Sequence, residues 1–422
     1  MSGPVGSQVQ PKDLQLPRLK EVKEGPILEL SFVEVSGEVY TRSDKWTAMH
    51  PLMSNNNGLD EQACLSAWHL VSGSVLPMAL KAAIEMGLLE VMAKAHQQEG
   101  IPLLTSHEIA DRLSAKNPDA PALLERLLRL LASHSILTCS TTTITNNNHD
   151  CNAKWRYGLG DKSRFLLGDE NGGSMGPLVL TLLDKVYVEP WYHLKDAVLE
   201  GGIPFRRAYG MNCFDYHGKD PRFNRLFNKG MQHHSTIIMN KILEIYTGFH
   251  GLRTLVDVGG GTGTNLGLIT ATYPQIKGFN FDLPHVVQEA PNFPGVQHVG
   301  GDMFASVQSG DAIFMKWILH DWDDDHCLKL LENCWNALPE NGKVIIAEMV
   351  APQTVDNSLS TSAVFQLDLL MLALNHGGKE RTEKEFEGLA KAAGFTGIKA
   401  ICCAYNFWVI EFYKNKSTNI YL

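Results

Sequence analysis

The pattern of apolar and polar positions divides the chain into a helical first part and a second part in which strands and helices alternate. Over residues 58–170 the spacing is helical: Thr105-Ser-His-Glu108 predicts a capping box, and the leucines within 123–131 give another helix one broad apolar face. Two strand-like runs follow, at Ile136–Ser140 and Trp155–Leu159. Two helices and then a β-hairpin predict a helical, winged-helix-like domain.

Residues 171–250 are expected to form further helices, and residues 251–422 an α/β domain. The strand candidates of this last part are apolar and alternate with helical stretches at about 323–337 and 382–393. They are Thr254–Val258, Lys277–Asp282, Asp311–Lys316, Lys343–Glu348 and the region Ile398–Val409. This alternation predicts a mostly parallel, Rossmann-like sheet with helices on both faces.

One stretch, Ala63–Leu80, carries no formal charge and is long enough to resemble a membrane span. It contains His69, Gly73 and Pro77 besides several serines, so its mean apolarity is too low for hydrocarbon. We therefore expect a buried helix with a break, and no membrane partner.

The charge balance argues against a nucleic-acid partner. The chain has 37 Lys and Arg against 46 Asp and Glu, a formal net charge of −9, whereas nucleic-acid binding calls for a basic face. The helix that would enter a groove carries only Arg126 and Arg129, next to Glu125. The 8 cysteines show no metal-ligand spacing. We expect reduced thiols in a cytoplasmic protein and no metal site.

The most informative motif is the glycine loop Asp257-Val-Gly259-Gly-Gly261-Thr-Gly263, which follows the first strand of the α/β part. Glycines allow a tight turn and a close backbone approach to a ligand at the start of a helix. A nicotinamide dinucleotide site would require another glycine where the sequence has Thr264. The spacing G-x-G-x-G, with an acidic residue two positions before it, is typical of S-adenosylmethionine (SAM) binding.

Two further acidic residues follow the next strands in the register that a nucleoside ligand needs. Asp282 ends the second strand, where a carboxylate can accept both ribose hydroxyls. Asp302 follows the third strand in Gly301-Asp-Met-Phe304, where Asp can accept from an adenine amino group while Met303 and Phe304 enclose the ring.

A candidate base follows the fourth strand, in Lys316-Trp-Ile-Leu-His320-Asp-Trp322. Glu348 closes the next strand, and Glu380 precedes another helix. A carboxylate on one imidazole nitrogen would fix the tautomer of His320 and leave the other nitrogen as a base. Such a base could remove the proton of a phenol, whose pKa is about 10.

These motifs together resemble the plant phenolic O-methyltransferases, and the caffeic acid 3-O-methyltransferase type in particular. The resemblance extends from about Leu59 to Phe412 and includes Ser74–Met78 and Trp191–Ala197. Its most specific parts are Leu255–Gly263, Phe279–Val286, Gly300–Phe304, Lys316–Trp322 and Gly377–Thr382.

The resemblance implies a role for individual residues. His320 would be the general base, flanked by Glu348 and Glu380, and Asp321 would contact the hydroxyl beside the one that is methylated. The residues around SAM would be Gly259, Asp282, Leu283, Asp302, Met303 and Lys316, with Ser235. The acceptor pocket would contain Leu182, His217, Phe223, Phe227, Met231, His234, Leu367, Leu370, Met371 and Asn375. Members of the family are homodimers, which implies dimerisation rather than DNA binding for residues 58–170.

Two departures from the family pattern concern the acceptor. The caffeic type has an Asn, which bonds to an acceptor oxygen, where this chain has Leu182, and a Pro where it has His376. We therefore expect an acceptor that is less hydroxylated near Leu182, or one that sits differently. A coumarin, a flavonoid or another phenolic could then replace caffeate or 5-hydroxyferulate.

Residues 1–57 match nothing in the family and are interpreted as a disordered leader or an alternative start. The sequence argues against two other functions for the whole chain. A nicotinamide-dependent oxidoreductase is disfavoured by Thr264, and a catalytically silent methyltransferase-like protein by the presence of His320, Glu348 and Glu380.

Overall fold

The computed structural model describes residues 58–145, 151–168, 172–288 and 290–415. The expected leader, residues 1–57, lies outside them. The chain divides into two compact units, Met1–His69 and Leu70–Leu422. All the elements below belong to the second unit, except that helix α2 (Gly58–Val71) begins in the first.

The helical domain contains the predicted helices and hairpin. It comprises α3 (Val75–Glu85), α4 (Leu88–Glu99), α5 (Ser106–Arg112), α6 (Ala120–Ser133), β1 (Leu137–Thr145) and β2 (Cys151–Leu159). Leu88, Leu128 and Tyr157 are fully buried in its core. The capping box is confirmed, because Thr105 N donates to Glu108 Oε2 at 2.7 Å and Glu108 N donates to the Thr105 hydroxyl at 3.2 Å.

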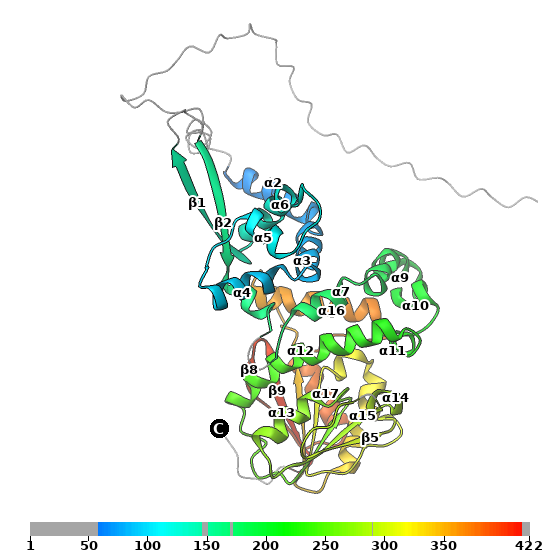
Figure 1. Ribbon diagram of the computed structural model, residues 1–422. Helices are drawn as coiled ribbons and strands as arrows, with labels where there is room; N and C mark the ends of the chain where they lie inside the picture. Colours follow the sequence, from blue (N-terminus) through cyan, green and yellow to red (C-terminus); the bar gives the residue numbers. More distant parts are fainter. Residues whose placement is uncertain (1–57, 146–150, 169–171, 289, 416–422) are drawn as a thin grey trace, which may run out of the picture. The chain divides into compact units, whose positions relative to one another are not determined.

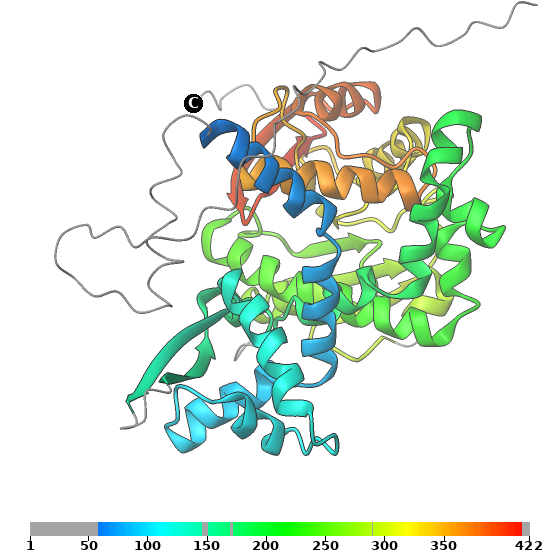
Figure 2. The ribbon, with the colours of Figure 1, turned by 90° about the horizontal axis from the view of Figure 1, so that it is seen from above.

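The hairpin is longer than the sequence pattern predicts, and it extends away from the helices α3–α6 (Figure 2). Both strands continue into the polar tract between the two apolar runs, and β1 includes Thr141–Thr145. Threonine is a good strand former.

The stretch Ala63–Leu80 has the predicted break but not the predicted burial. Helix α2 ends at Val71 and α3 begins at Val75, yet Leu70 is 83% exposed and Val71 76% exposed. The expectation of a buried helix is wrong for the single chain, because no described part of this chain covers these side chains. Among the described residues no single helix has the length and apolarity to cross a bilayer; the bent pair Asp60–Val71 and Val75–Glu85 passes that test only when counted together.

A run of short helices and one long helix connects the helical domain to the sheet (Figure 1). The long helix is α12 (Pro221–Ile245). Asp220 caps its N-terminus, because the Asp220 carboxylate accepts from Phe223 N at 3.0 Å. Before it come α7 (Gly176–Leu182), α8 (Lys185–Val188), η2 (Glu189–His193), α9 (Leu194–Glu200), α10 (Pro204–Tyr209) and α11 (Cys213–His217).

The α/β domain is built on a sheet with the strand order β5-β4-β3-β6-β7-β9-β8. The strands are β3 (Thr254–Val258), β4 (Lys277–Asp282), β5 (Val296–Gly300), β6 (Ala312–Lys316), β7 (Lys343–Glu348), β8 (Gly397–Ala404) and β9 (Phe407–Tyr413). The five strands from β5 to β7 are parallel, as expected, and β9 and β8 pair antiparallel at one edge. The single region predicted at Ile398–Val409 contains a turn, because Tyr405 and Asn406 both have positive φ, the backbone of a tight hairpin.

Helices cover both faces of the sheet, which confirms the predicted layers (Figure 1). On one face, α15 (Asp324–Ala337) and α17 (Glu383–Ala392) pack on β3, β6 and β7. On the other face, α12 and α13 (Thr264–Thr272) pack on the same strands. Helices α14 (Pro284–Val287) and α16 (Leu359–Leu374) complete the domain.

Replacing Gly388 with Ala is expected to stabilise the fold. Gly388 lies inside α17, and a Cβ added there would meet no atom within 4 Å. Alanine restricts the unfolded chain and favours the helix, so the free energy of unfolding should rise by about 0.5–1 kcal/mol, measured by urea denaturation. Gly278→Ala in β4 is the matched control and should destabilise, because its Cβ would lie 2.7 Å from the Leu266 side chain. A Gly388→Ala variant less stable than the wild type would contradict the described packing of α17.

Candidate active site

The carboxyl ends of four neighbouring parallel strands bring the predicted SAM residues together. Gly259 follows β3, Asp282 ends β4, Asp302 follows β5 and Lys316 ends β6. The register fixes their levels, since Asp282 pairs with Gly300 and Gly259 N donates to Phe281 O at 2.8 Å. Residues far apart in sequence thus meet at one edge of the sheet, where ligands of such sheets bind.

The glycine loop has a backbone that side chains would not allow. Gly259, Gly261 and Gly263 have φ values of 67°, 56° and 85°, in the left-handed region that favours glycine. A Cβ on Gly259 would also lie 2.4 Å from Ile318 Cδ1. The loop is therefore a cradle of bare backbone in front of α13.

Asp282 holds this loop and the start of the next helix through its carboxylate. Its Oδ2 accepts from Gly261 N at 2.8 Å, and its Oδ1 accepts from Leu283 N at 2.7 Å. Burial raises the pKa of Asp282 although both backbone hydrogen bonds oppose the shift. Each oxygen retains a lone pair for a further hydrogen bond. Leu283 is 41% exposed beside it.

The remaining SAM candidates lie around this loop. Asp302 Oδ1 accepts from Phe304 N at 2.9 Å, which fixes the turn after β5, and Met303 packs on the sheet core. Ser235 is buried on α12. Lys316 is buried too, its Nζ 3.4 Å from His234 Nδ1.

The buried charges at this edge are mainly acidic. Neither carboxylate oxygen of Asp257 has a hydrogen-bond partner among the described residues, and burial raises its pKa to about 8. Burial lowers the pKa of Lys316 to about 7, against the attraction of Glu348 and Asp257. A bare-backbone cradle held by the carboxylate of Asp282 fits the nucleoside part of a ligand such as SAM.

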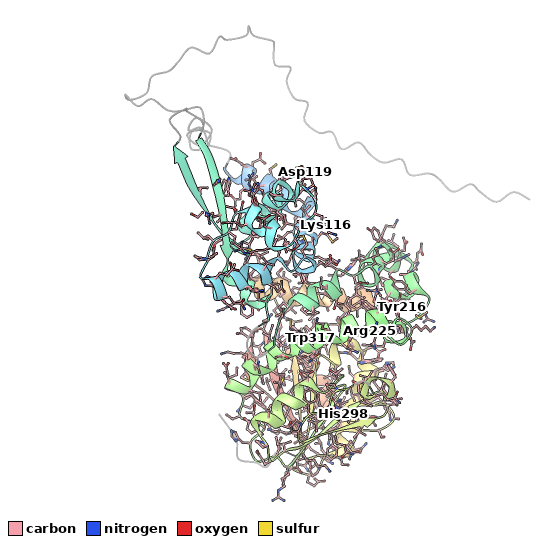
Figure 3. The ribbon with its side chains drawn as sticks, in the orientation of Figure 1. Lys116, Asp119, Tyr216, Arg225, His298 and Trp317 are labelled. Carbon is pink, nitrogen blue, oxygen red and sulfur yellow. The ribbon has the colours of Figure 1, made fainter. Side chains whose placement is uncertain are left out.

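Trp317, which no sequence motif singles out, follows β6 and contacts two histidines of the site; it is labelled in Figure 3. Its backbone turns sharply, with φ 55°. Its indole stacks on His234 at 4.2 Å between ring centroids and on His320 at 5.5 Å. The tryptophan therefore fixes the plane of the candidate base.

His320 is held through one ring nitrogen. Its Nδ1 lies 2.7 Å from Glu380 Oε1, and its Nε2 lies 3.7 Å from Asp321 Oδ1. Burial, with repulsion from Asp368, raises the pKa of Glu380 to about 8. Because Glu380 occupies Nδ1, Nε2 is the nitrogen left for acid–base chemistry.

Glu348 acts on the backbone rather than on the imidazole. Its Oε1 accepts from Ile318 N at 2.9 Å and from Leu319 N at 3.0 Å. Burial raises its pKa, while the nearby His320 lowers it. Glu348 thus fixes the chain that leads into His320 and does not bond to the ring.

Arg381 fixes the same segment from its other side. The side chain is only 1% exposed, and it donates to Leu319 O at 2.5 Å, to Trp322 O at 2.8 Å and to Asp324 Oδ1 at 2.7 Å. The signal that could have identified it lies in its position directly after Glu380.

The acceptor candidates form two groups. In the first group Asn375 donates to Asp321 Oδ1 at 2.7 Å and to Met371 Sδ at 3.6 Å. Burial raises the pKa of Asp321 to about 7. The second group is an apolar cluster that contains Leu182, Phe223, Phe227 and Leu370, with the ring of His217 4.4 Å from Phe227.

Two further acceptor candidates, Met231 and Leu367, are located only by their positions on helices, and His376 lies at the surface. Met231 follows Phe227 by one turn on α12, and Leu367 precedes Leu370 by one turn on α16. His376 has a 73% exposed side chain that pairs with Asp323 at 3.3 Å. The structure therefore places the His376 departure at the surface and the Leu182 departure in the apolar cluster.

Comparisons with known proteins match both halves of the chain. An O-methyltransferase domain matches residues 191–396, and an O-methyltransferase dimerisation domain matches residues 68–169. Caffeic acid 3-O-methyltransferase of Catharanthus roseus is 59% identical over 84% of this chain and 96% of that protein. Caffeic acid 3-O-methyltransferase 1 of Populus tremuloides is 60% identical over 84% of this chain and 95% of that protein.

A solved structure adds the cofactor. CalO1, a methyltransferase in calicheamicin biosynthesis in its SAH-bound form, is 25% identical, with a TM-score of 0.68 over 84% of this chain and 98% of that chain. The chain belongs to the SAM-dependent O-methyltransferases that carry a dimerisation domain, the family that includes the plant caffeic acid 3-O-methyltransferases.

Proposed function

We propose that this SAM-dependent phenol O-methyltransferase uses Nε2 of His320 to take the proton of the acceptor hydroxyl. The observation that carries the proposal is the 2.7 Å contact between His320 Nδ1 and Glu380 Oε1. It leaves Nε2 free beside Asp321, at the edge where the sheet binds its ligand.

The residues on the SAM side would bind and orient the donor. Asp282 would accept from ribose hydroxyls, Asp302 from the adenine amino group, and the glycine loop would lie against the ligand. When bound, SAM supplies a methyl group on a positively charged sulfur that a phenolate oxygen can take in one displacement.

The residues on the acceptor side would orient a flat phenol. Asp321, held by Asn375, would accept from the hydroxyl beside the reacting one. Trp317 keeps the imidazole in one plane, and Met371 lies in contact with Asn375. Holding both reactants in this way supplies much of the rate enhancement.

Each of the three segments of the chain would have a separate role. Residues 58–170 would form the dimerisation domain, 171–250 part of the acceptor pocket and 251–422 the catalytic domain. A homodimer would cover the exposed apolar side chains of α2, among them Leu70 and Val71. Seven of the cysteines in the described part of the chain, Cys64, Cys139, Cys213, Cys327, Cys334, Cys402 and Cys403, are free, which suits a reducing, cytoplasmic location.

The acceptor would be a small plant phenolic. The caffeic type of relative supports a phenylpropanoid, and Leu182 supports a change in how its ring oxygens are recognised. A panel of caffeic acid, 5-hydroxyferulic acid, coumarins and flavonoids, with labelled SAM and mass spectrometry, tests this. We expect the highest kcat/KM for an acceptor other than the two acids. If either acid is the best acceptor, Leu182 has not shifted the specificity.

Replacing His320 with Ala tests the base. We expect methyl transfer to fall by roughly a hundredfold or more, while calorimetry shows SAM binding close to that of the wild type. The matched control is His250→Ala, at an exposed histidine outside the site. This variant should keep the methyl-transfer rate and the SAM affinity of the wild type. Unchanged transfer by His320→Ala would refute the assignment of the base.

Replacing Glu380 with Gln should lower kcat and change how stability depends on pH. The amide can still contact Nδ1 but cannot carry the negative charge that wild-type Glu380 carries above about pH 8, so we expect kcat measured above that pH to fall at least roughly tenfold. The pKa of about 8 means that folded Glu380 keeps its proton at about pH 6, whereas the unfolded chain, with a Glu pKa of about 4.3, has lost it.

The sign of the stability effect follows from this difference. Because the folded state holds more protons, this group lowers the free energy of unfolding of the wild type as the pH rises towards 8. The stability of Glu380→Gln relative to the wild type should therefore increase between about pH 6 and pH 8 and then level off. Urea denaturation across that range measures it, and a difference independent of pH would contradict a buried, titrating Glu380.

A further inference from the structure

Three polar side chains meet inside the apolar cluster that contains Leu182. The Tyr187 hydroxyl lies 3.3 Å from His217 Nε2 and 3.5 Å from Cys213 Sγ. Tyr187 and Cys213 are buried members of this cluster, whose other buried members are apolar. We call these three residues the Tyr187 cluster. No sequence motif singles out Tyr187 or Cys213.

All three side chains are neutral near pH 7. Burial lowers the pKa of His217 to about 4 and raises that of Cys213 to about 12. Burial also raises the pKa of Tyr187. The phenol and the thiol therefore keep their protons, and the imidazole carries one proton on one of its two nitrogens.

The contacts decide which nitrogen carries that proton. A phenol is a stronger donor than a thiol, and an imidazole nitrogen is a stronger acceptor than sulfur. The best pairing is donation from the Tyr187 hydroxyl to Nε2, with the Cys213 thiol towards the phenolic oxygen. The imidazole proton is then on Nδ1.

Nδ1 of His217 is the unused group of the cluster. It makes no hydrogen bond with the described residues, and it is not among the buried polar atoms that lack a partner. His217 is 5% exposed, and this nitrogen is the polar atom of the cluster left for a hydrogen bond with a ligand. The ring lies against Phe227 and Phe223, and Phe227 belongs to the same apolar cluster as Leu182. The donor thus lies beside the acceptor candidates of that cluster.

We propose that Tyr187 fixes His217 as an Nδ1–H donor to a second ring oxygen, a methoxy or hydroxyl group, on the phenolic acceptor. This inference rests on the proposed function and specifies its acceptor. Leu182 cannot form the hydrogen bond to the acceptor that an Asn at this position would form. His217, beside the same apolar cluster, would form one instead. Tyr187 is a positioning residue, because it acts through His217.

Caffeic acid and 5-hydroxyferulic acid are suitable probes, because 5-hydroxyferulic acid has one additional ring oxygen, as a methoxy group. Calorimetry with the SAH-loaded enzyme gives the dissociation constant of each acid, and kcat and KM are measured beside it. In the wild type we expect 5-hydroxyferulic acid to bind roughly fivefold to tenfold more tightly, the range for one neutral hydrogen bond. Tyr187→Phe should abolish most of this preference and leave the KM for SAM unchanged.

The matched control is Tyr209→Phe. Tyr209 packs against the apolar cluster that contains Leu182, but its hydroxyl donates to Lys185 O at 3.3 Å and not to His217. This variant should keep the preference to within about twofold. A second pair of variants separates recognition from folding: His217→Asn keeps an amide donor near Nδ1 and should retain part of the preference, whereas His217→Phe should lose it.

The outcomes separate this inference from the proposed function. A preference that survives in Tyr187→Phe and His217→Phe, or a wild type that binds both acids equally, would overturn it. Loss of the preference for 5-hydroxyferulic acid in Tyr209→Phe would also overturn the inference. Removal of any tyrosine hydroxyl from the apolar cluster would then have the same effect, whether or not that hydroxyl contacts His217. If the wild type methylates no phenol at all, the proposed function fails, whatever the binding preference.

Discussion

The hydrogen bond between His320 Nδ1 and Glu380 Oε1 is the interaction on which the rest of the site depends. It exists only if the loop after β6 and the segment between α16 and α17 stay in register. Glu348 fixes the first loop through the amides of Ile318 and Leu319. Arg381 joins that loop to the segment of Glu380. Much of the buried polar structure thus serves to position one imidazole.

The same arrangement buries several ionisable side chains, and their removal from water is electrostatically unfavourable. Glu348, Glu380 and Asp257 are removed from water with raised pKa values, and a nearby cation, Lys316, has a lowered pKa. A fold does not gain stability from burying such a set of ionisable groups. Their presence is better explained by ligands than by the needs of the fold.

The sequence predicts the sheet and its ligand-binding edge well, because the strands are continuous apolar runs and glycine and acidic residues follow them directly. It fails where the outcome depends on contacts between distant segments. The exposure of Leu70 could not be foreseen, since an apolar helix looks alike whether its own chain or another covers it. The backbone role of Glu348 and the meeting of Tyr187, Cys213 and His217 depend on side-chain geometry that no spacing encodes.

The acid-rich edge has a consequence for turnover. Methyl transfer converts a sulfonium into a neutral thioether, so the ligand loses its positive charge during the reaction. The carboxylates at this edge, Asp282 among them, would attract the cation before the reaction but not the neutral product. The attraction that favours entry of the donor would thus be cancelled by the chemistry itself, which would help the spent nucleoside to leave.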